Sequence, residues 1–258
     1  MKLELSLVKK GYKIIKSNLI IDIKKRIRTQ IMKAAKTILK ENNYKNLVFK
    51  NINDIITYVY SEDKKYKKKM ISSLYEILPS IPEIHRFASD NFFLKLAKKS
   101  GVLYPSIGTN LSIRIDRPFD KKYTTSMHQD FWYSFISTNS ITIWFNLTTV
   151  SEEDGPLIIY KNSHKKIYKF QDNKSGSYTA VLKKDKRFNK NNIFLKEDEI
   201  LIFNQLLLHE SGQNISKKPR LSVQIRFNDL KKAQKIRSSY TCVSSNHVIK
   251  EQKKNLLN

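Results

Sequence analysis

The sequence predicts an α+β fold that is mainly β, in which a helical N-terminal layer packs on a β-sandwich or barrel. Two observations lead to this prediction. In about the first hundred residues the apolar positions recur with the period of amphipathic helices, and from about residue 108 they recur with a period of two. The stretches with the period of two are short, and turn-rich segments separate them, as in all-β sandwiches and barrels.

The helical pattern is clearest in two stretches of the N-terminal region. One apolar stripe consists of Ile31, Ala34, Ala35 and Ile38. A second stripe runs through 71–78 and ends at Pro79, because proline does not continue a helix. A further apolar stretch at 92–97 precedes Gly101.

Strands are predicted where apolar and polar residues alternate. The apolar positions of the three longest such stretches are Leu111, Ile113 and Ile115, then Ile141, Ile143, Phe145 and Leu147, then Leu221, Val223, Ile225 and Phe227. Shorter candidates are 156–160, 178–182 and 199–204. Alternation of this kind places the apolar side chains on one face of a strand and the polar ones on the other.

The length of 258 residues suits a single domain. We expect residues 1–107 to form the helical layer, 108–229 the β core and 230–258 a basic C-terminal tail. Within the core, 161–198 is polar and rich in Lys and Asn. We interpret this stretch as a mobile insert or lid.

The chain is strongly basic, with 49 Lys and Arg against 23 Asp and Glu and a formal net charge of +26. Such a balance is compatible with nucleic-acid binding, because phosphate contacts need Lys and Arg. However, most of the positive residues are lysines, and 123–160 contains neither Lys nor Arg. We therefore interpret the excess as solvated surface and expect no nucleic-acid partner.

Several classes of protein are excluded by composition. The single cysteine, Cys242, excludes an intramolecular disulfide framework and cysteine-held zinc or iron–sulfur sites. No apolar run approaches the ~18 residues that a membrane helix needs. The first residues lack the apolar core of a signal peptide. We expect a cytoplasmic protein without a membrane span.

A candidate metal site begins with His128 and Asp130. On an extended backbone these two residues project to the same face, so the imidazole and the carboxylate can converge. His209 is the candidate for a third ligand, because it follows the strand predicted at 199–204 and precedes a turn. Two imidazoles and one carboxylate leave three positions of an octahedral ion open, as in non-haem Fe(II) sites.

Arg220 opens the next predicted strand, on its polar face with Ser222 and Arg226. A guanidinium that points into a barrel needs an anionic partner. A dicarboxylate cosubstrate would supply one through a two-pronged hydrogen bond. The sequence therefore suggests an anion site beside the metal site.

The stretch from about 108 to 229 resembles the phytanoyl-CoA dioxygenase family of Fe(II)/2-oxoglutarate-dependent oxygenases. The matching segments come in family order, and they are His128-Gln129-Asp130, Trp144-Phe145-Asn146-Leu147, Glu153-Asp154-Gly155-Pro156-Leu157, Asn162-Ser163-His164-Lys165, His209-Glu210-Ser211 and Pro219-Arg220-Leu221-Ser222. One departure is that Lys161 and Asn162 stand where the family usually has Pro-Gly before Ser-His. This departure touches no ligand.

The resemblance implies a double-stranded β-helix, a jelly-roll or cupin-like barrel. It implies Fe(II) as cofactor, held by His128, Asp130 and His209, with 2-oxoglutarate and O₂ as cosubstrates. Arg220 would grip the distal carboxylate of 2-oxoglutarate with Ser222 or Ser211 helping, and Trp144 would line the pocket. The implied enzyme is a hydroxylase, because halogenating relatives lack the carboxylate that Asp130 supplies.

We expect this dioxygenase to hydroxylate an unactivated C–H bond of a small polar metabolite, with release of succinate and CO₂. The candidate substrate residues are Arg114, Gln129, Phe131, Trp132 and Arg226. For the two arginines a salt bridge is an equally good interpretation, and for the two aromatic residues simple packing is the better one. The alternative functions are a nucleic-acid demethylating dioxygenase, suggested by the Arg220/Arg226 spacing and the charge, and a non-catalytic β-barrel binding protein.

Overall fold

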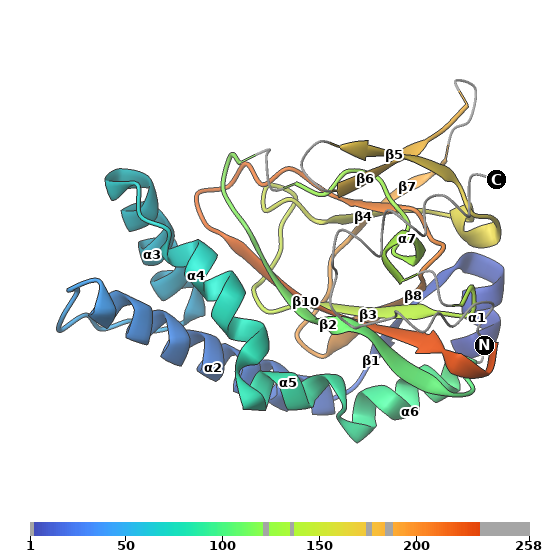
Figure 1. The fold of residues 1–258 in the computed structure, drawn as a ribbon, viewed down its shortest axis with the longest axis horizontal. Helices are drawn as coiled ribbons and strands as arrows, with labels where there is room; N and C mark the ends of the chain where they lie inside the picture. The colour runs from blue at the N-terminus through green and yellow to red at the C-terminus, as the bar shows by residue number, and fades with distance from the viewer. Residues whose placement is uncertain (1–2, 121–123, 135–136, 174–176, 184–187, 233–258) are drawn as a thin grey trace.

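The computed structural model describes residues 3–120, 124–134, 137–173, 177–183 and 188–232 (Figure 1). The N-terminal region is helical, as predicted. Its helices are α1 (Leu3–Lys10), α2 (Leu19–Glu41), α3 (Ile52–Tyr66), α4 (Met70–Ile77), α5 (Pro82–Ala88) and α6 (Asn91–Lys99), with a 3₁₀ turn at Leu78–Ser80. The stripes at 31–38, 71–78 and 92–97 lie in α2, α4 with its 3₁₀ turn, and α6.

Among the described residues, the β core contains three antiparallel sheets. Its strands are β1 (Tyr12–Lys16), β2 (Pro105–Asp116), β3 (Ile141–Asn146), β4 (Leu157–Tyr160), β5 (Lys169–Asn173), β6 (Ser177–Val181), β7 (Lys190–Ile193), β8 (Glu199–Asn204), β9 (His209–Ser211) and β10 (Arg220–Asp229), and a short helix, α7 (Phe131–Ser134), precedes β3. The strand orders are β1-β8-β3-β10-β2, β7-β4-β9 and β5-β6. Figure 1 shows α2, α5 and α6 below the larger sheet and the smaller sheets above it.

This arrangement confirms the predicted fold class, a double-stranded β-helix with a helical N-terminal layer. All six predicted strands are present, as β2, β3, β4, β6, β8 and β10. The sequence pattern does not predict β1, because its two adjacent isoleucines follow neither period. β1 nevertheless belongs to the larger sheet, where it pairs with β8 at the edge.

One apolar core joins the helical layer to the larger sheet. Ile27 and Ile31 of α2 are fully buried in it. The ring of Phe93 on α6 stacks on Phe145 of β3, with 6.0 Å between the centroids. Because Phe145 points toward the helices, its neighbours Trp144 and Asn146 project from the opposite face of β3. That face is turned toward the smaller sheets.

A buried lysine fixes α2 to the turn before β8. The Nζ of Lys24 donates to the carbonyl oxygens of Glu197, at 2.9 Å, and Lys196, at 3.3 Å. Burial lowers the pKa of Lys24 to about 8. One turn further along α2, Arg28 donates to both carboxylate oxygens of Glu197, at 2.6 and 2.8 Å. These contacts hold the helical layer against the barrel.

The predicted insert at 161–198 contains β5, β6 and β7. The β5–β6 hairpin packs over α7, with ring centroids 5.1 Å apart for Trp132 and Phe170 and 5.2 Å apart for Tyr133 and Tyr178. Residues 174–176 and 184–187, and 233–258 of the predicted basic tail, lie outside the described residues. Mobility of the insert stays a prediction.

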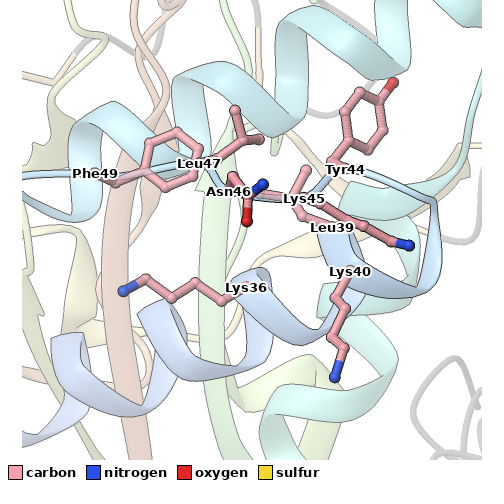
Figure 2. Close-up of a pocket in the computed structure, with 8 residues that line it drawn as sticks. All are labelled: Lys36, Leu39, Lys40, Tyr44, Lys45, Asn46, Leu47 and Phe49. Carbon is pink, nitrogen blue, oxygen red and sulfur yellow. The ribbon is translucent and has the colours of Figure 1, made fainter.

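A groove in the helical layer lies between the last turns of α2 and the loop that follows. The residues that line it are Lys36, Leu39, Lys40, Tyr44, Lys45, Asn46, Leu47 and Phe49 (Figure 2). None of the residues predicted for the metal or anion site is among them. Within the described parts of the chain, no helix is both long and apolar enough to span a bilayer.

Candidate metal centre

The two predicted histidine ligands are joined by an antiparallel β-bridge. The backbone N–H of His128 donates to the carbonyl of His209 at 2.9 Å, and the N–H of His209 donates back at 3.0 Å. Residues that exchange both bonds stand directly opposite each other, so their side chains project to the same face. The imidazole centroids are 4.1 Å apart.

Asp130 completes a buried triad with these imidazoles. Its Oδ1 lies 3.6 Å from Nε2 of His128 and 3.7 Å from Nε2 of His209. One donor atom from each of the three residues falls within 4.8 Å of the others. The residues that sequence spacing selected are therefore brought together at one point in the barrel.

Hydrogen bonds fix the tautomers of both imidazoles. Nδ1 of His128 lies 2.8 Å from the carbonyl oxygen of Ser126, and Nδ1 of His209 lies 3.0 Å from that of Leu207. A carbonyl only accepts, so each Nδ1 carries a hydrogen, and in the neutral imidazole the lone pair is then on Nε2. Burial, with His128 adding to it, lowers the pKa of His209 to about 3. The imidazole of His209 is thus neutral, which is the form that binds metals.

Asp130 is held in its ionised form by neighbours on both oxygens. Oδ2 accepts a hydrogen bond from Oγ1 of Thr142 at 2.6 Å, and Oδ1 accepts one from Nη2 of Arg226, also at 2.6 Å. Burial alone would raise the pKa of Asp130, but Arg226 and the two imidazoles outweigh it and hold that pKa well below its ordinary value.

The donor set fits a non-haem Fe(II) centre. Two neutral imidazoles and one carboxylate on one face of an ion form the facial triad of Fe(II) oxygenases, with the other positions open. Each imidazole is also backed by a hydrogen bond on its second nitrogen, as metal-ligating histidines almost always are. A closed structural zinc site would instead need a fourth protein ligand.

Arg220 lies buried on β10, directly opposite Asp116 of β2. Its Nη2 donates to Oδ2 of Asp116 at 2.6 Å, and Nη2 of Arg114 donates to the other oxygen at 3.0 Å. Burial would raise the pKa of Asp116, but Arg220 and Arg114 keep it below its ordinary value. The carboxylate of Asp116 therefore accepts hydrogen bonds from two guanidinium groups.

The remaining donors of Arg220 have no hydrogen-bond partner among the residues that the structure describes. These donors are Nε and Nη1 of Arg220. Oγ of Ser222, on the same strand face, also has no hydrogen-bond partner among the described residues. Both side chains are almost completely buried. Buried donors without partners are costly, and an anion of matching shape would satisfy them. The ring of Trp144 lies 5.9 Å from Cζ of Arg220 and walls this region.

The other predicted site residues lie in separate surroundings. Arg114 and Arg226 share the polar face of β2 and β10 with Arg220, and Nη1 of Arg114 also donates to Oγ1 of Thr125 at 2.5 Å. Phe131 and Trp132 are buried in an apolar cluster of α7 and the β5–β6 hairpin. Ser211 ends β9, and its backbone N–H donates to the carbonyl of Thr125.

The side chain of Gln129 is bonded to the main chain. Its Nε2 donates to the carbonyl oxygens of Lys166, at 2.8 Å, and Leu206. Its Oε1 accepts from the backbone N–H of Tyr168 at 2.9 Å. These contacts favour a role in holding the two flanking ligands in place over contact with a substrate.

Sequence reasoning missed Asp116 and Thr142, each of which holds a predicted site residue. The sequence offered a weak signal for both residues, namely their positions on the polar faces of predicted strands. Asp116 ends the polar face that begins with Ser112 and Arg114, and Thr142 precedes Trp144 on the polar face of its strand. Which residue each would face depends on the strand register, which the sequence does not state.

Comparisons with known proteins agree with this geometry. The family profile described as phytanoyl-CoA dioxygenase (PhyH) matches residues 109–222. No curated protein sequence matches the chain.

Solved structures share the fold at low identity. EctD from S. alaskensis, with 2-oxoglutarate and 5-hydroxyectoine, has a TM-score of 0.55 at 15% identity over 89% of this chain and 76% of that one. The epimerase SnoN, with Fe³⁺, alpha ketoglutarate and nogalamycin RO, has a TM-score of 0.54 at 15% identity over 88% and 82%. The non-heme monooxygenase ThoJ has a TM-score of 0.55 at 12% identity over 88% and 77%.

The profile covers β3 to β9, most of β2 and the start of β10, and it spans all three triad residues and Arg220. The motifs, the barrel and the buried triad point to the same assignment. Residues 109–222, which contain the triad and Arg220, match the phytanoyl-CoA dioxygenase-like family of Fe(II)/2-oxoglutarate-dependent oxygenases.

Proposed function

We propose that this oxygenase is a dioxygenase that hydroxylates a C–H bond of a small polar metabolite. The observation that carries the proposal is the pairing of a buried triad with a buried guanidinium that keeps two nitrogens unsatisfied among the described residues. The triad suits an Fe(II) ion with open positions. The guanidinium suits one end of a dicarboxylate.

The roles of the residues follow from these contacts. His128, Asp130 and His209 would hold iron through Nε2, Oδ1 and Nε2. Arg220 would bind the distal carboxylate of 2-oxoglutarate, with Ser222 donating a further hydrogen bond and Asp116 holding the guanidinium in place. When bound, iron and 2-oxoglutarate supply the oxidising chemistry that inserts oxygen into a C–H bond and yields succinate and CO₂.

The surroundings of the triad would bind and shield the substrate. The ring of Tyr133 lies 5.7 Å from that of His128, and the guanidinium of Arg226 lies 5.9 Å from the ring of Tyr133. Burial raises the pKa of Tyr133, so its hydroxyl stays neutral. Aromatic rings beside polar groups suit a metabolite with both apolar and polar parts. We assign Phe131 and Trp132 to the packing behind this wall.

The chemistry of two relatives supports a small-molecule substrate. EctD was solved with 5-hydroxyectoine and SnoN with nogalamycin RO. SnoN is an epimerase, so this fold also supports reactions other than hydroxylation. The identity of the product therefore has to be measured.

The test is a screen for succinate release. The protein, loaded with Fe(II) and 2-oxoglutarate, is incubated with sets of amino acids, sugars and biosynthetic intermediates, and products are analysed by mass spectrometry. We expect substrate-stimulated succinate and a product that gains one oxygen atom. A product that loses two hydrogens or inverts a centre would contradict hydroxylation. Demethylation of alkylated DNA or RNA would replace the metabolite with a nucleic acid.

A further inference from the structure

We propose that Arg226 and Thr142 are positioning residues that restrict Asp130 to binding the metal through one oxygen. This inference rests on the proposed metal centre and concerns residues outside the triad. Its basis is that the two residues stand opposite each other in adjacent strands and hold opposite ends of the same carboxylate.

The two positioning residues form a cross-strand pair. Arg226 of β10 and Thr142 of β3 are direct partners in the antiparallel ladder. Side chains of such a pair leave the sheet on the same face and lie about 4.5–5.5 Å apart at Cβ. The sheet therefore fixes the spacing between the Cβ atoms from which the guanidinium and the hydroxyl extend.

Each partner takes a different oxygen of Asp130. Oγ1 of Thr142 donates to Oδ2 at 2.6 Å, and Thr142 is fully buried. Nη2 of Arg226 donates to Oδ1 at 2.6 Å, and only 11% of its side chain is exposed. Oδ1 is also the atom that faces Nε2 of both histidines. A metal held by both imidazoles would thus bind Oδ1, while Oδ2 accepts the hydrogen bond from Thr142.

This arrangement has a consequence for the coordination number. A carboxylate that rotates to bind through both oxygens takes one more position on the ion. The hydrogen bond from Thr142 opposes that rotation, since Oδ2 would have to leave its donor. The three remaining octahedral positions of a bound Fe(II) ion would then stay open for cosubstrates.

The two arginines of β10 have separate partners. Arg220 pairs with Asp116, and Arg226 pairs with Asp130. We therefore assign Arg226 to the metal centre and Arg220 to the anion site. Its role toward the metal is that of an outer partner that orients a ligand.

The test uses Co(II) binding to the full chain, without 2-oxoglutarate or substrate. Co(II) affinity is measured by calorimetry, and the coordination number is read from the visible absorption of the bound ion, which weakens as that number rises. The variants are Thr142→Val, Thr142→Ser, Arg226→Met and Arg226→Lys. The control is Arg86→Met. Arg86 is an exposed arginine on α5 that forms an ion pair with Glu83.

We expect Arg226→Met to lower Co(II) affinity by about 10- to 100-fold, as is typical when an outer partner of a ligand is removed. Thr142→Val should weaken the absorption as Asp130 turns to bind through both oxygens. Thr142→Ser should retain the wild-type spectrum, because it keeps the hydroxyl, and Arg226→Lys should recover part of the affinity. Arg86→Met should match the wild type.

Wild-type affinity and spectrum in both Thr142→Val and Arg226→Met would overturn the positioning role. Circular dichroism checks that each variant is folded. If Arg226→Met does not fold, the comparison of Thr142→Val with Thr142→Ser decides, and identical spectra for these two would overturn the proposal. Failure of the wild type itself to bind Co(II) would instead contradict the metal centre on which the proposed function depends.

Discussion

Arg220 and Asp116 stand directly opposite each other across the β2–β10 ladder, and a buried hydrogen bond of 2.6 Å joins Nη2 to Oδ2. This pair explains how a guanidinium can be kept in the barrel before an anion arrives. Asp116 supplies the counter-charge and uses only one of the three nitrogens. The other two remain free to bind a ligand, as far as the described residues show.

Replacement of Asp116 should destabilise the protein and make it depend on the cosubstrate. Removing one partner of a buried charge pair costs about 3–5 kcal/mol, so Asp116→Asn should lower the free energy of unfolding by roughly that amount. Added 2-oxoglutarate would then be the main counter-ion for Arg220. It should raise the melting temperature of Asp116→Asn by more than that of the wild type. Equal increments would show that Asp116 and the ligand do not share a guanidinium.

Replacement of Arg220 should weaken 2-oxoglutarate binding and leave the metal in place. Truncating one partner of a buried charge pair costs about 2–5 kcal/mol, which is roughly 30-fold or more in affinity. Arg220→Ala should therefore raise the 2-oxoglutarate requirement for succinate release by at least about 30-fold. Arg220→Lys should recover only part of the lost affinity for 2-oxoglutarate, since an ammonium group lacks the fork geometry of a guanidinium. An unchanged titration with Arg220→Ala would rule out the cosubstrate role.

Replacement of His209 should remove the metal without unfolding the barrel. The bridge between His128 and His209 consists of main-chain groups, so it survives the loss of an imidazole. We expect His209→Ala to lose bound iron and succinate production while its circular dichroism spectrum stays that of the wild type. Wild-type iron content in this variant would refute the ligand assignment.

Replacement of Gln129 should affect stability more than substrate binding. Gln129→Leu removes the hydrogen bonds that Gln129 makes with the carbonyls of Lys166 and Leu206 and with the N–H of Tyr168. A buried group left unsatisfied costs about 1–3 kcal/mol. Urea unfolding should show that the free energy of unfolding falls by an amount on this scale. A substrate contact would instead raise KM at unchanged stability.

Asp229 should contribute stability that depends on pH. Its carboxylate accepts bonds from the backbone N–H groups of Leu103 and Tyr104 and from Nδ2 of Asn139, at 3.1, 2.9 and 2.6 Å. Burial would raise the pKa of Asp229, but these bonds outweigh it and lower the pKa below its ordinary value of 3.8.

A lowered pKa means that the folded state favours the charged carboxylate, so the contribution is complete above about pH 4 and is lost as the pH falls through the folded pKa. Asp229→Asn should therefore be less stable than the wild type at neutral pH, and the difference should shrink at lower pH. Urea unfolding from pH 7 to pH 2.5 measures it. A constant difference would contradict this role.

The sequence predicted the elements whose signal is local. The alternation in β2, β3 and β10 reports one buried face, and the spacing of His128 and Asp130 reports two side chains on one side of an extended backbone. His209 needed only the knowledge that it follows a strand. Each of these features can be read from a short stretch of chain.

Features that depend on register could not be predicted. Asp116 meets Arg220, and Thr142 meets Arg226, because β10 pairs with β2 on one side and β3 on the other in a particular register. A shift of one residue would turn these side chains to the other face. Gln129 shows the same limit, since its partners at 166, 168 and 206 are distant in sequence.

The main-chain bridge between His128 and His209 also bears on how the protein acquires its ion. Two backbone hydrogen bonds bring these ligands together, and neither bond needs a cation. In small zinc domains, by contrast, the chain folds only when the ion binds. A site assembled in advance can release its ion and be reloaded without refolding. Its occupancy is then governed by exchange with the surrounding supply of divalent cations.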